Sequence, residues 1–542
     1  MQEWLEQLSD QRMLHRENHR NDSEYWSASS PWGVVTTAHY RATAAGVEML
    51  AKGGNAFDAA VASSLALGVV ESAGSGLGGM TMVILHLANS KRTIALKGPC
   101  RAPLNCDPKI VAASPRRRGY TAIAVPSNPA VLDYLMQKYG TLPLEVVAAP
   151  AIRLAETGFP LTSLQHWLIS RYASQLKAEG NVSHLFLTAQ GEPLPAGTWF
   201  RQPELAQTLQ QLASAGFQDF YHGEIGQRML ADLQQNNSFI TAADFEQIPW
   251  PVEAAPLTSQ IGEWTICTFP PPGGGTTLLQ MLHLFDCLVP ENFDPDSPEG
   301  VVLLASIIRR ARQDRRKFPA GKAPVADNLS VDLASQMYAQ MAAAEITEAL
   351  NAGGETSHLC VIDRHHNVVS MTQSIERSYG AAVLTPELGF LYNGYMKTFK
   401  LENPKHPFFL RPGAAARSNA APTIVLQRGK PLFAIGSTGS ERMISGIFEV
   451  LIRLRNQSPF AAVSAPRFHC TPQGIVMYES RLSEAAVTAL RQHGFTLKAF
   501  KPWSFKVGGL HLAGLVGQTA TGVAEPRRDG AAMGPVEEPL VY

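Results

Sequence analysis

The sequence predicts an α+β fold in which sheets are stacked on one another and covered by helices. Helical spacing of apolar residues dominates the chain up to about residue 350, whereas pairs of strand-like segments dominate the part that follows. Within the first part, the run MTMVILHL at residues 80–87 is apolar throughout and has the length of a strand. Such a run is typical of a strand that is covered on both faces.

The N-terminal elements alternate between polar, extended and helical segments. Residues 1–32 are polar with a weak helical period, which predicts an appendage to the main fold, and residues 34–37 predict a short strand. Residues 42–52 and 56–70 carry small and apolar residues at helical spacing and are separated by Gly53-Gly54-Asn55. We therefore expect two closely packed helices joined by a tight turn.

The middle of the chain, about residues 120–350, is mainly helical with proline and glycine residues as breaks. Its clearest segments are helices over 206–213, 225–233, 276–287 and 300–350, and a strand over 264–269 that runs into 270–275 (PPPGGG). The last helical segment ends at Asn351-Ala352-Gly353-Gly354, which is a flexible stop.

The C-terminal part is rich in strands. Residues 358–362 and 368–375 flank the turn 363–367 (DRHHN) and predict an antiparallel hairpin. Two more strand pairs follow: 423–427 with 432–436, and 474–478 with 497–500. Two stacked, mainly antiparallel sheets would accommodate these pairs.

Composition excludes several classes of function. The 542 residues contain 46 Lys+Arg and 46 Asp+Glu, a balance that argues against a nucleic-acid surface or a polybasic membrane patch. The N-terminus lacks the features of a secretory signal, and the apolar run 59–70 is too short to span a bilayer. The six cysteines show no paired or CxxC spacing, which is typical of reduced thiols. We expect a cytoplasmic protein with no membrane and no nucleic-acid partner.

Two glycine-rich motifs do not predict a nucleotide site. Residues 74–79 (GSGLGG) match G-x-G-x-x-G, but a helix precedes them, a strand follows, and no acidic residue stands between Gly79 and Asp107. Residues 272–277 (PGGGTT) lack the lysine of a phosphate-binding loop. No His-Glu-x-x-His pair occurs either, so we expect neither a cofactor nor a metal.

The junction Gly353-Gly354-Glu355-Thr356-Ser357-His358 has the composition that self-cleavage requires. A hydroxyl residue at the start of a strand, after a flexible segment, can approach the carbonyl that precedes it. Cleavage before Thr356 would place a free α-amine and a hydroxyl on the same residue. The pKa of such an amine is near 8, roughly, so a useful fraction is neutral and accepts the hydroxyl proton.

Several ordered segments resemble one family, the γ-glutamyltranspeptidases (glutathione hydrolases) and related acylases of the N-terminal-nucleophile hydrolase superfamily. The resemblance covers roughly residues 33–534. The segments that carry it are 53–56, 58–60, 75–79, 101–103, 149–152, 158–159, 203–206, 208–209, 220–223, 271–274, 356–358, 422–425 and 525–530.

The resemblance implies a four-layer αββα sandwich that is processed between Glu355 and Thr356. Residues 33–355 would form the large subunit and residues 356–542 the small subunit of a heterodimer, and further association stays open. Thr356 is then the expected nucleophile. Ser374 is the hydroxyl residue expected to support it. Gly439 and Ser440 are expected to donate backbone N–H groups to the oxyanion, and a change from the family's usual glycine to serine keeps such a donor.

The residues expected to bind substrate depart from the family pattern. The family arginine for the glutamyl α-carboxylate aligns with Pro99, and Arg101 is either its replacement or a structural residue. Ser418 and Asn419 match two adjacent hydroxyl residues of the family, so one hydroxyl is kept. The positions that hold the α-ammonium carry Glu376, Tyr395 and Thr398, and the last replaces an aspartate. Glu376 is expected to face a substrate cation, Arg377 or Arg417.

Two hypotheses from different classes follow. The first is a self-processing amidohydrolase or acyltransferase that acts on a small-molecule amide, such as a glutathione-like γ-glutamyl compound or another acyl amide. The second is a non-catalytic relative that binds a ligand through the altered pocket. The retained Thr356, Ser374, Ser418 and Gly439 favour the enzyme.

Overall fold

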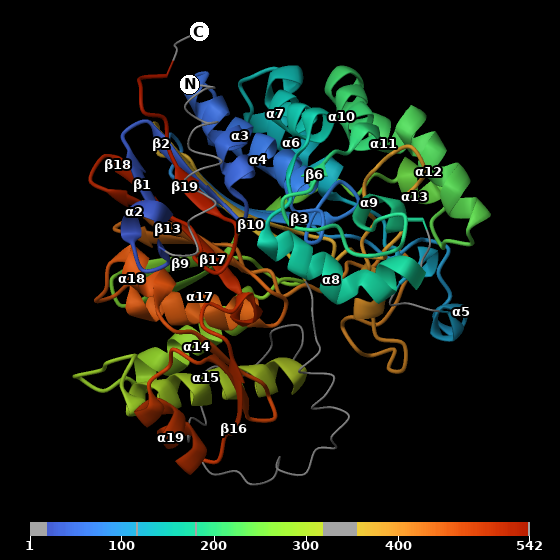
Figure 1. The fold of residues 1–542 in the computed structure, drawn as a ribbon. Coiled ribbons are helices and arrows are strands. Elements are labelled where there is room, and N and C mark those ends of the chain that lie inside the picture. Colours follow the sequence, from blue (N-terminus) through green and yellow to red (C-terminus); the bar gives the residue numbers. More distant parts are fainter. Residues whose placement is uncertain (1–18, 115–117, 179–180, 318–354, 540–542) are drawn as a thin grey trace.

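A computed structural model of the chain describes residues 19–114, 118–178, 181–317 and 355–539. Two seven-stranded sheets lie at its centre, and groups of helices cover their outer faces (Figure 1). The layers therefore follow the order helix, sheet, sheet, helix. This confirms the predicted αββα sandwich.

The first sheet is antiparallel at every pairing. In spatial order it contains β1 (Ser27–Ser30), β18 (Thr519–Val523), β17 (Gly509–Val516), β13 (Lys430–Thr438), β12 (Thr423–Gln427), β9 (Trp264–Thr268) and β8 (Leu257–Ile261). Its outer face is covered by α14 (Gly275–Leu288) and α17 (Arg442–Arg453), and α15 (Pro298–Lys317) packs against α14.

The second sheet is also antiparallel throughout. Its order is β19 (Ala531–Met533), β2 (Gly33–Thr37), β10 (Ser357–Asp363), β11 (Val368–Ser374), β3 (Met80–Leu87), β4 (Arg92–Gly98) and β7 (Val252–Ala254). The helices on its side of the molecule include α3 (Tyr40–Ala51), α4 (Ala56–Val70), α6 (Asn128–Tyr139), α7 (Leu144–Thr157) and α10 (Pro203–Ala215).

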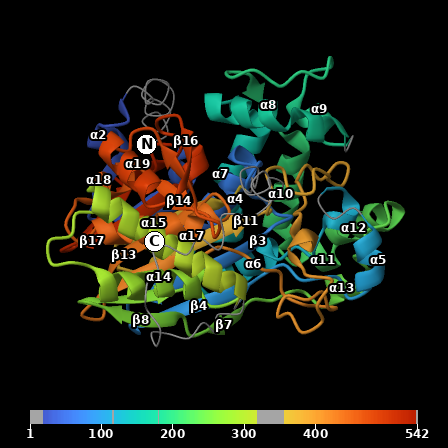
Figure 2. The same ribbon diagram turned by 90° about the horizontal axis from the view of Figure 1, so that it is seen from below.

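Smaller elements complete the described chain. A three-stranded sheet contains β14 (Phe468–Cys470), β15 (Ile475–Glu479) and β16 (Thr496–Phe500), and packs with α19 (Glu484–Gln492) against α15 (Figure 2). The predicted pair 474–478 with 497–500 therefore lies outside the two large sheets, and its strands run parallel. The peripheral helices and the short strand pair are α2 (Ser23–Trp26), α5 (Pro108–Ala113), α8 (Ser163–Ala178), α9 (Ser183–Phe186), α11 (Asp219–His222), α12 (Glu224–Gln235), α13 (Ala242–Glu246), α18 (Pro459–Ser464), β5 (Phe159–Pro160) and β6 (Trp199–Phe200).

The strands of the second sheet are buried on both faces because their side chains alternate between two apolar clusters. On β10, Leu359 and Val361 pack in the cluster formed with α3 and α4. Cys360 and Ile362 point to the other side, into a cluster that also contains Ile424 of the first sheet. This sandwiched position explains why the central strands read as continuous apolar runs.

The predicted helix pair at 42–52 and 56–70 is confirmed as α3 and α4. Asn55 caps α4: its side chain accepts backbone N–H groups of Phe57 (2.8 Å) and Asp58 (3.1 Å). The helices approach closely at Gly46, where a Cβ atom would lie 2.3 Å from Oγ of Ser63. Because small residues occupy this crossing, α3 and α4 pack closely against each other.

The predicted hairpin is β10 and β11, and its turn sets the register of the site. One carboxylate oxygen of Asp363 accepts two backbone N–H groups of the turn, at 2.9 and 3.0 Å. From there the antiparallel pairing runs to Ser357 opposite Gln373. The next residues along are Thr356 on one side and Ser374 on the other.

Part of the segment assigned to the polar appendage belongs to the sandwich. Residues 27–30 form the edge strand β1, which pairs with β18, and Trp26 before it is buried. An edge strand tolerates polar residues on its open side, which is why its sequence, SASS, resembles a linker. Residues 1–18, and the predicted continuation of the helix beyond 317 to 350, lie outside the described residues.

The described helices include none with both the length and the hydropathy of a membrane-spanning segment.

Candidate active site

Thr356 is buried immediately before β10, directly after the peptide bond predicted to be cut. Its Oγ1 lies 3.2 Å from Oγ of Ser374. The Ser374 hydroxyl donates to the carbonyl oxygen of Glu355 over 3.1 Å. Because a serine hydroxyl has a single proton, the Ser374 oxygen is left to accept the proton of Thr356. One side chain thus contacts both the attacking hydroxyl and the carbonyl to be attacked.

The backbone after β11 fixes the orientation of Ser374. The N–H of Glu376 donates to Ser374 Oγ over 2.9 Å. Glu376 has a φ of +81°, a region that costs a non-glycine residue about 1–2 kcal/mol. A residue held there by its surroundings is typical of a functional site.

The glycine-rich segment 74–79 packs directly against these residues. A Cβ atom on Gly74 would lie 3.3 Å from the backbone N of Thr356, and one on Gly79 would lie 2.6 Å from the carbonyl oxygen of Ser374. The N–H of Ile375 also donates to the Gly74 carbonyl, at 3.2 Å. These glycines therefore permit close approach to the ends of β10 and β11.

The predicted oxyanion residues lie between β13 and α17. Gly439 has a φ of +102° and Ser440 a φ of +59°. β13 crosses β10 closely at Gly436, where a Cβ atom would overlap the ring of His358 (2.1 Å). This crossing carries the end of β13 toward the start of β10. The use of the Gly439 and Ser440 N–H groups as oxyanion donors stays a prediction.

Of the partners expected for Glu376, the structure confirms Arg377, and it adds Lys397. Its Oε1 lies 2.8 Å from Nζ of Lys397, and its Oε2 lies 3.7 Å from Nε of Arg377. Among the described contacts Arg417 is not a partner of this carboxylate, and its guanidinium instead lies 5.8 Å from the ring of Phe408. The sequence did not indicate Lys397, because it lies 21 positions after Glu376, on a separate short helix.

Tyr395 and Thr398 are the ends of that short helix, Tyr395–Thr398. The Thr398 hydroxyl donates to the Tyr395 carbonyl over 2.8 Å and so stabilises this helical turn. Burial raises the pKa of Tyr395 well above its ordinary value, although the hydroxyls of Ser374 and Ser418 lower it in part. Tyr395 is therefore neutral. It connects Ser374, which is predicted to support the nucleophile, with Ser418, which is predicted to bind the substrate carboxylate.

Ser418 and Asn419 lie beside the segment that contains Arg101. The Ser418 carbonyl accepts from Nη2 of Arg315 over 2.9 Å, and its hydroxyl accepts from the N–H of Ala420 over 3.0 Å. Asn419 Oδ1 is buried, with no hydrogen-bond partner among the described residues. Its unsatisfied acceptor is a candidate contact for a substrate donor.

Arg101 contributes backbone pairing with Val125 and Ala415. Its N–H donates to the Val125 carbonyl over 3.4 Å and its carbonyl accepts from the Val125 N–H over 2.8 Å. This pairing places residue 101 next to the segment that leads to Ser418. The position of Arg101 is compatible with both expected roles, replacement of the family arginine and a structural residue.

A group of buried polar residues that the sequence did not indicate surrounds the junction. The Glu355 carboxylate lies 3.0 Å from Nη2 of Arg528, and Nη1 of Arg528 lies 3.5 Å from Glu71. Ser357 Oγ donates to Glu71 and lies 2.9 Å from Ser75 Oγ. Burial raises the pKa of Glu71 to about 7, although Arg528 and Ser357 lower it in part. Segment 525–530 is one of those that resemble the family, but its sequence did not indicate which residues Arg528 contacts.

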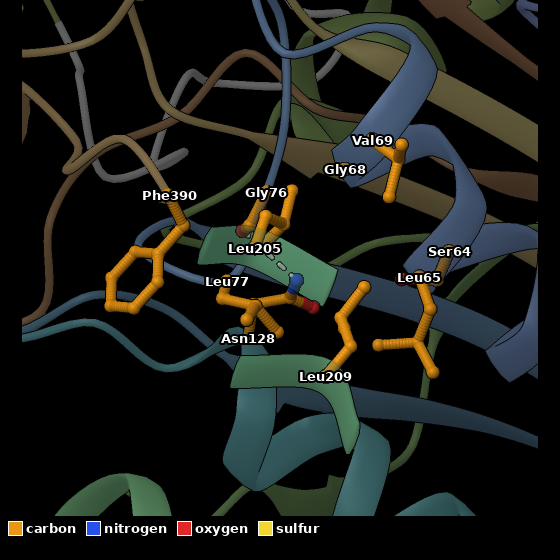
Figure 3. Close-up of a pocket in the computed structure, with 10 residues that line it drawn as sticks. All are labelled: Ser64, Leu65, Gly68, Val69, Gly76, Leu77, Asn128, Leu205, Leu209 and Phe390. Atoms are coloured by element: carbon orange, nitrogen blue, oxygen red, sulfur yellow. Dashed lines mark hydrogen bonds between the residues drawn. The ribbon is translucent and has the colours of Figure 1, made fainter. Parts of the chain in front are cut away.

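A separate apolar pocket lies between α4 and α10 (Figure 3). Asn128, one of the lining residues, donates to the Gly76 carbonyl over 3.0 Å, the dashed line in the figure. The predicted site residues are not among those lining it, which are Ser64, Leu65, Gly68, Val69, Gly76, Leu77, Asn128, Leu205, Leu209 and Phe390. We therefore interpret it as a packing gap behind the glycine-rich segment.

The described residues contain no cluster of three His, Cys, Asp or Glu side chains arranged to hold a metal ion.

Comparisons with known proteins identify the family of this chain. A sequence profile described as γ-glutamyltranspeptidase matches residues 42–535. Glutathione hydrolase 2 of Arabidopsis thaliana is 31% identical over 467 residues, which cover 81% of this chain and 80% of that protein. The acylase ACY 1 proenzyme of Pseudomonas sp. (strain SE83) is 31% identical over 490 residues, covering 86% and 87%. The crystal structure of a cephalosporin acylase from Bacillus halodurans shares the fold, with a TM-score of 0.82 at 24% identity over 94% of this chain and 97% of that one. The chain is an enzyme that belongs to the γ-glutamyltranspeptidase family.

Proposed function

We propose that this chain cleaves itself between Glu355 and Thr356 and then uses Thr356 to hydrolyse, or transfer the acyl group of, a small-molecule amide. The observation that carries the proposal is the position of Ser374, whose Oγ lies 3.2 Å from the Thr356 hydroxyl and 3.1 Å from the Glu355 carbonyl oxygen. The names of two relatives, a glutathione hydrolase proenzyme of Bacillus subtilis and the acylase ACY 1 proenzyme, also support a self-processing precursor.

Self-cleavage would proceed by an N-to-O acyl shift. Thr356 Oγ1 attacks the carbonyl carbon of Glu355 and passes its proton to Ser374 Oγ, which passes its own proton to the carbonyl oxygen. The carbonyl re-forms, the C–N bond breaks, that proton moves to the nitrogen, and an ester joins Glu355 to the Thr356 oxygen. Water then hydrolyses the ester, which gives a carboxylate on Glu355 and a free hydroxyl and α-amine on Thr356. The Ser374 proton on the carbonyl favours the attack by stabilising negative charge on that oxygen.

The mature reaction would repeat this chemistry on an external amide. The neutral α-amine of Thr356 accepts the hydroxyl proton, the oxygen attacks the substrate carbonyl, and the amine product leaves with a proton. The N–H groups of Gly439 and Ser440 are the proposed donors to the oxyanion. Water resolves the acyl ester in hydrolysis, and an amine resolves it in transfer.

For the acyl group we propose a γ-glutamyl or a glutaryl chain, and the pairing of Glu376 favours the glutaryl chain. In the described structure Lys397 and Arg377 lie beside Glu376, so its charge is already balanced. An incoming α-ammonium would have to compete with these cations. A glutaryl group, which lacks the ammonium, meets no such competition.

Incubation of the purified chain, followed by a denaturing gel and N-terminal sequencing, tests the first step. We expect the 58.7 kDa band to be replaced by two bands, the smaller beginning at Thr356, whereas Thr356→Ala stays uncut. An electrophilic glutamine analogue should then label the Thr356 peptide. An uncut chain would favour the non-catalytic binding protein, whereas a cut chain without labelling would favour an acyl group that lacks the α-ammonium.

The cytoplasmic location and any association beyond the two subunits stay predictions. Fractionation of cells and light scattering of the cleaved protein would test them.

A further inference from the structure

Glu355 is held at two points in the uncut chain. Its carbonyl oxygen accepts from Ser374 Oγ at 3.1 Å, and its side-chain carboxylate accepts from Nη2 of Arg528 at 3.0 Å. Both side chains of the ion pair are buried, with exposed fractions of 5% for Glu355 and 1% for Arg528. The residue that supplies the scissile carbonyl is therefore fixed on both sides of its Cα atom.

Arg528 is itself held from several directions. Its Nη1 lies 3.5 Å from Glu71, and its guanidinium lies 5.8 Å from the ring of Phe505. A Cβ atom on Gly509 would lie 2.4 Å from Nε of Arg528, so this glycine makes room for the side chain. A planar guanidinium confined in this way presents its donors in fixed directions.

Glu71 connects Arg528 to the other side of the scissile bond. Its second carboxylate oxygen accepts from the hydroxyl of Ser357, which also lies next to Ser75. The contacts thus run from residue 355 through Arg528 and Glu71 to residue 357, and they enclose the Glu355–Thr356 peptide bond.

The charges favour a specific pairing of Arg528 with Glu355. Burial lowers the pKa of Arg528, but Glu355, and after it Glu71, more than offset this, so the group stays a cation. A buried carboxylate without a cation would be costly. Attack on a carbonyl also demands that the reacting atoms be held about 3–3.5 Å apart in a defined orientation.

We propose that Arg528, held by Glu71, is a positioning residue for self-cleavage: it binds the Glu355 side-chain carboxylate and so fixes the Glu355 carbonyl for attack by Thr356. This inference rests on the proposed function. The Glu355 side chain thereby has a role in positioning, although it takes no part in the bond changes. After cleavage Glu355 is no longer covalently attached to Thr356.

The test is a double-mutant cycle on the rate of self-cleavage. The unsubstituted chain, Glu355→Gln, Arg528→Met and the double variant are made in a cell-free system with a pulse of labelled methionine. Samples are taken over time and resolved on a denaturing gel. The matched control is Arg228→Met, which removes an arginine from an ion pair with the exposed Glu387, at 2.7 Å. Thermal melting of each uncut chain shows whether it is folded.

We expect each single variant to cleave at least about tenfold more slowly than the unsubstituted chain, a loss of about 1.4 kcal/mol in transition-state stabilisation. The double variant should be no slower than the slower single variant, because each residue acts through the other. Arg528→Lys should recover part of the rate. Once cleaved, Glu355→Gln should show the kcat and KM of the unsubstituted enzyme.

Two results would overturn the inference: Glu355→Gln cleaving as fast as the unsubstituted chain, or effects of the two substitutions that multiply. A purely structural Arg528 would give the first result even if Arg528→Met failed to fold. Failure of the unsubstituted chain to cleave would count against the proposed function instead.

Discussion

Lys397 Nζ lies 2.8 Å from Oε1 of Glu376 in the candidate active site. Glu376 occupies the position that the resemblance assigns to binding of a substrate ammonium. The Lys397 side chain therefore supplies an ammonium group at this position, where it would compete with the α-ammonium of a γ-glutamyl substrate.

Lys397→Met should shift acyl preference toward substrates with an α-ammonium. Among the described ion pairs, removal of the lysine leaves Glu376 with the more distant Arg377 alone, at 3.7 Å, so the carboxylate becomes available. We expect the ratio of kcat/KM for γ-glutamyl anilide to that for glutaryl anilide to rise about tenfold, equal to about 1.4 kcal/mol. Lys405→Met, at an exposed lysine, is the control. An unchanged ratio in Lys397→Met would show that Glu376 does not face the acyl group.

Ser374→Ala should slow self-cleavage by about 100-fold or more, because it removes the donor to the Glu355 carbonyl and the acceptor for the Thr356 hydroxyl. Ser374→Thr keeps the hydroxyl and should retain most of the rate. Gel time courses of both variants measure the effect. Equal cleavage by the alanine and threonine variants would contradict the role of this hydroxyl.

Gly439→Ala should lower activity, whereas Ser440→Gly should leave it nearly unchanged. At Gly439 a Cβ atom would lie 3.0 Å from the Cα of Gly508, and its φ is +102°, so we expect kcat/KM to fall about 100-fold as the backbone donor shifts. Ser440 has a φ of +59°, where glycine relieves strain of about 1 kcal/mol. Its variant should keep activity within about twofold. Loss of activity in Ser440→Gly alone would assign the role to the serine side chain.

Glu525→Gln should destabilise the protein at neutral pH and much less in acid. Burial alone would raise the pKa of Glu525, but the guanidinium groups of Arg467 and Arg527 outweigh it and lower this pKa from 4.5 to about 2. The carboxylate therefore contributes stability that is fully present above pH 4.5 and is lost as the pH falls toward 2. Breaking such a buried pair costs about 3–5 kcal/mol.

Urea unfolding of Glu525→Gln and of the unsubstituted chain, at several pH values between 7 and 3, measures this difference. The exposed Glu263→Gln serves as control. A free-energy difference that stays constant over this pH range would mean that Glu525 is not the charged partner of the two arginines.

The local parts of the site could be predicted because their causes are local. Two segments of strand length around a turn rich in polar residues gave the hairpin of β10 and β11, and the family resemblance at residues 356–358 indicated Thr356. The edge strand β1 escaped prediction, since a polar strand that pairs on one side has no apolar pattern. Lys397 escaped because nothing in its neighbours specifies a partner 21 positions earlier.

The sequence by itself determined the helix pair α3 and α4, the hairpin of β10 and β11, and the family, because periodicity, turn chemistry and motifs depend on neighbouring residues. Only the tertiary structure decided which charges meet. Glu355 and Arg528 are 173 positions apart and lie together because β10 and the segment after β18 meet in the sandwich. The partner of a long charged side chain depends on how distant segments cross, and that crossing is set by packing of the whole core.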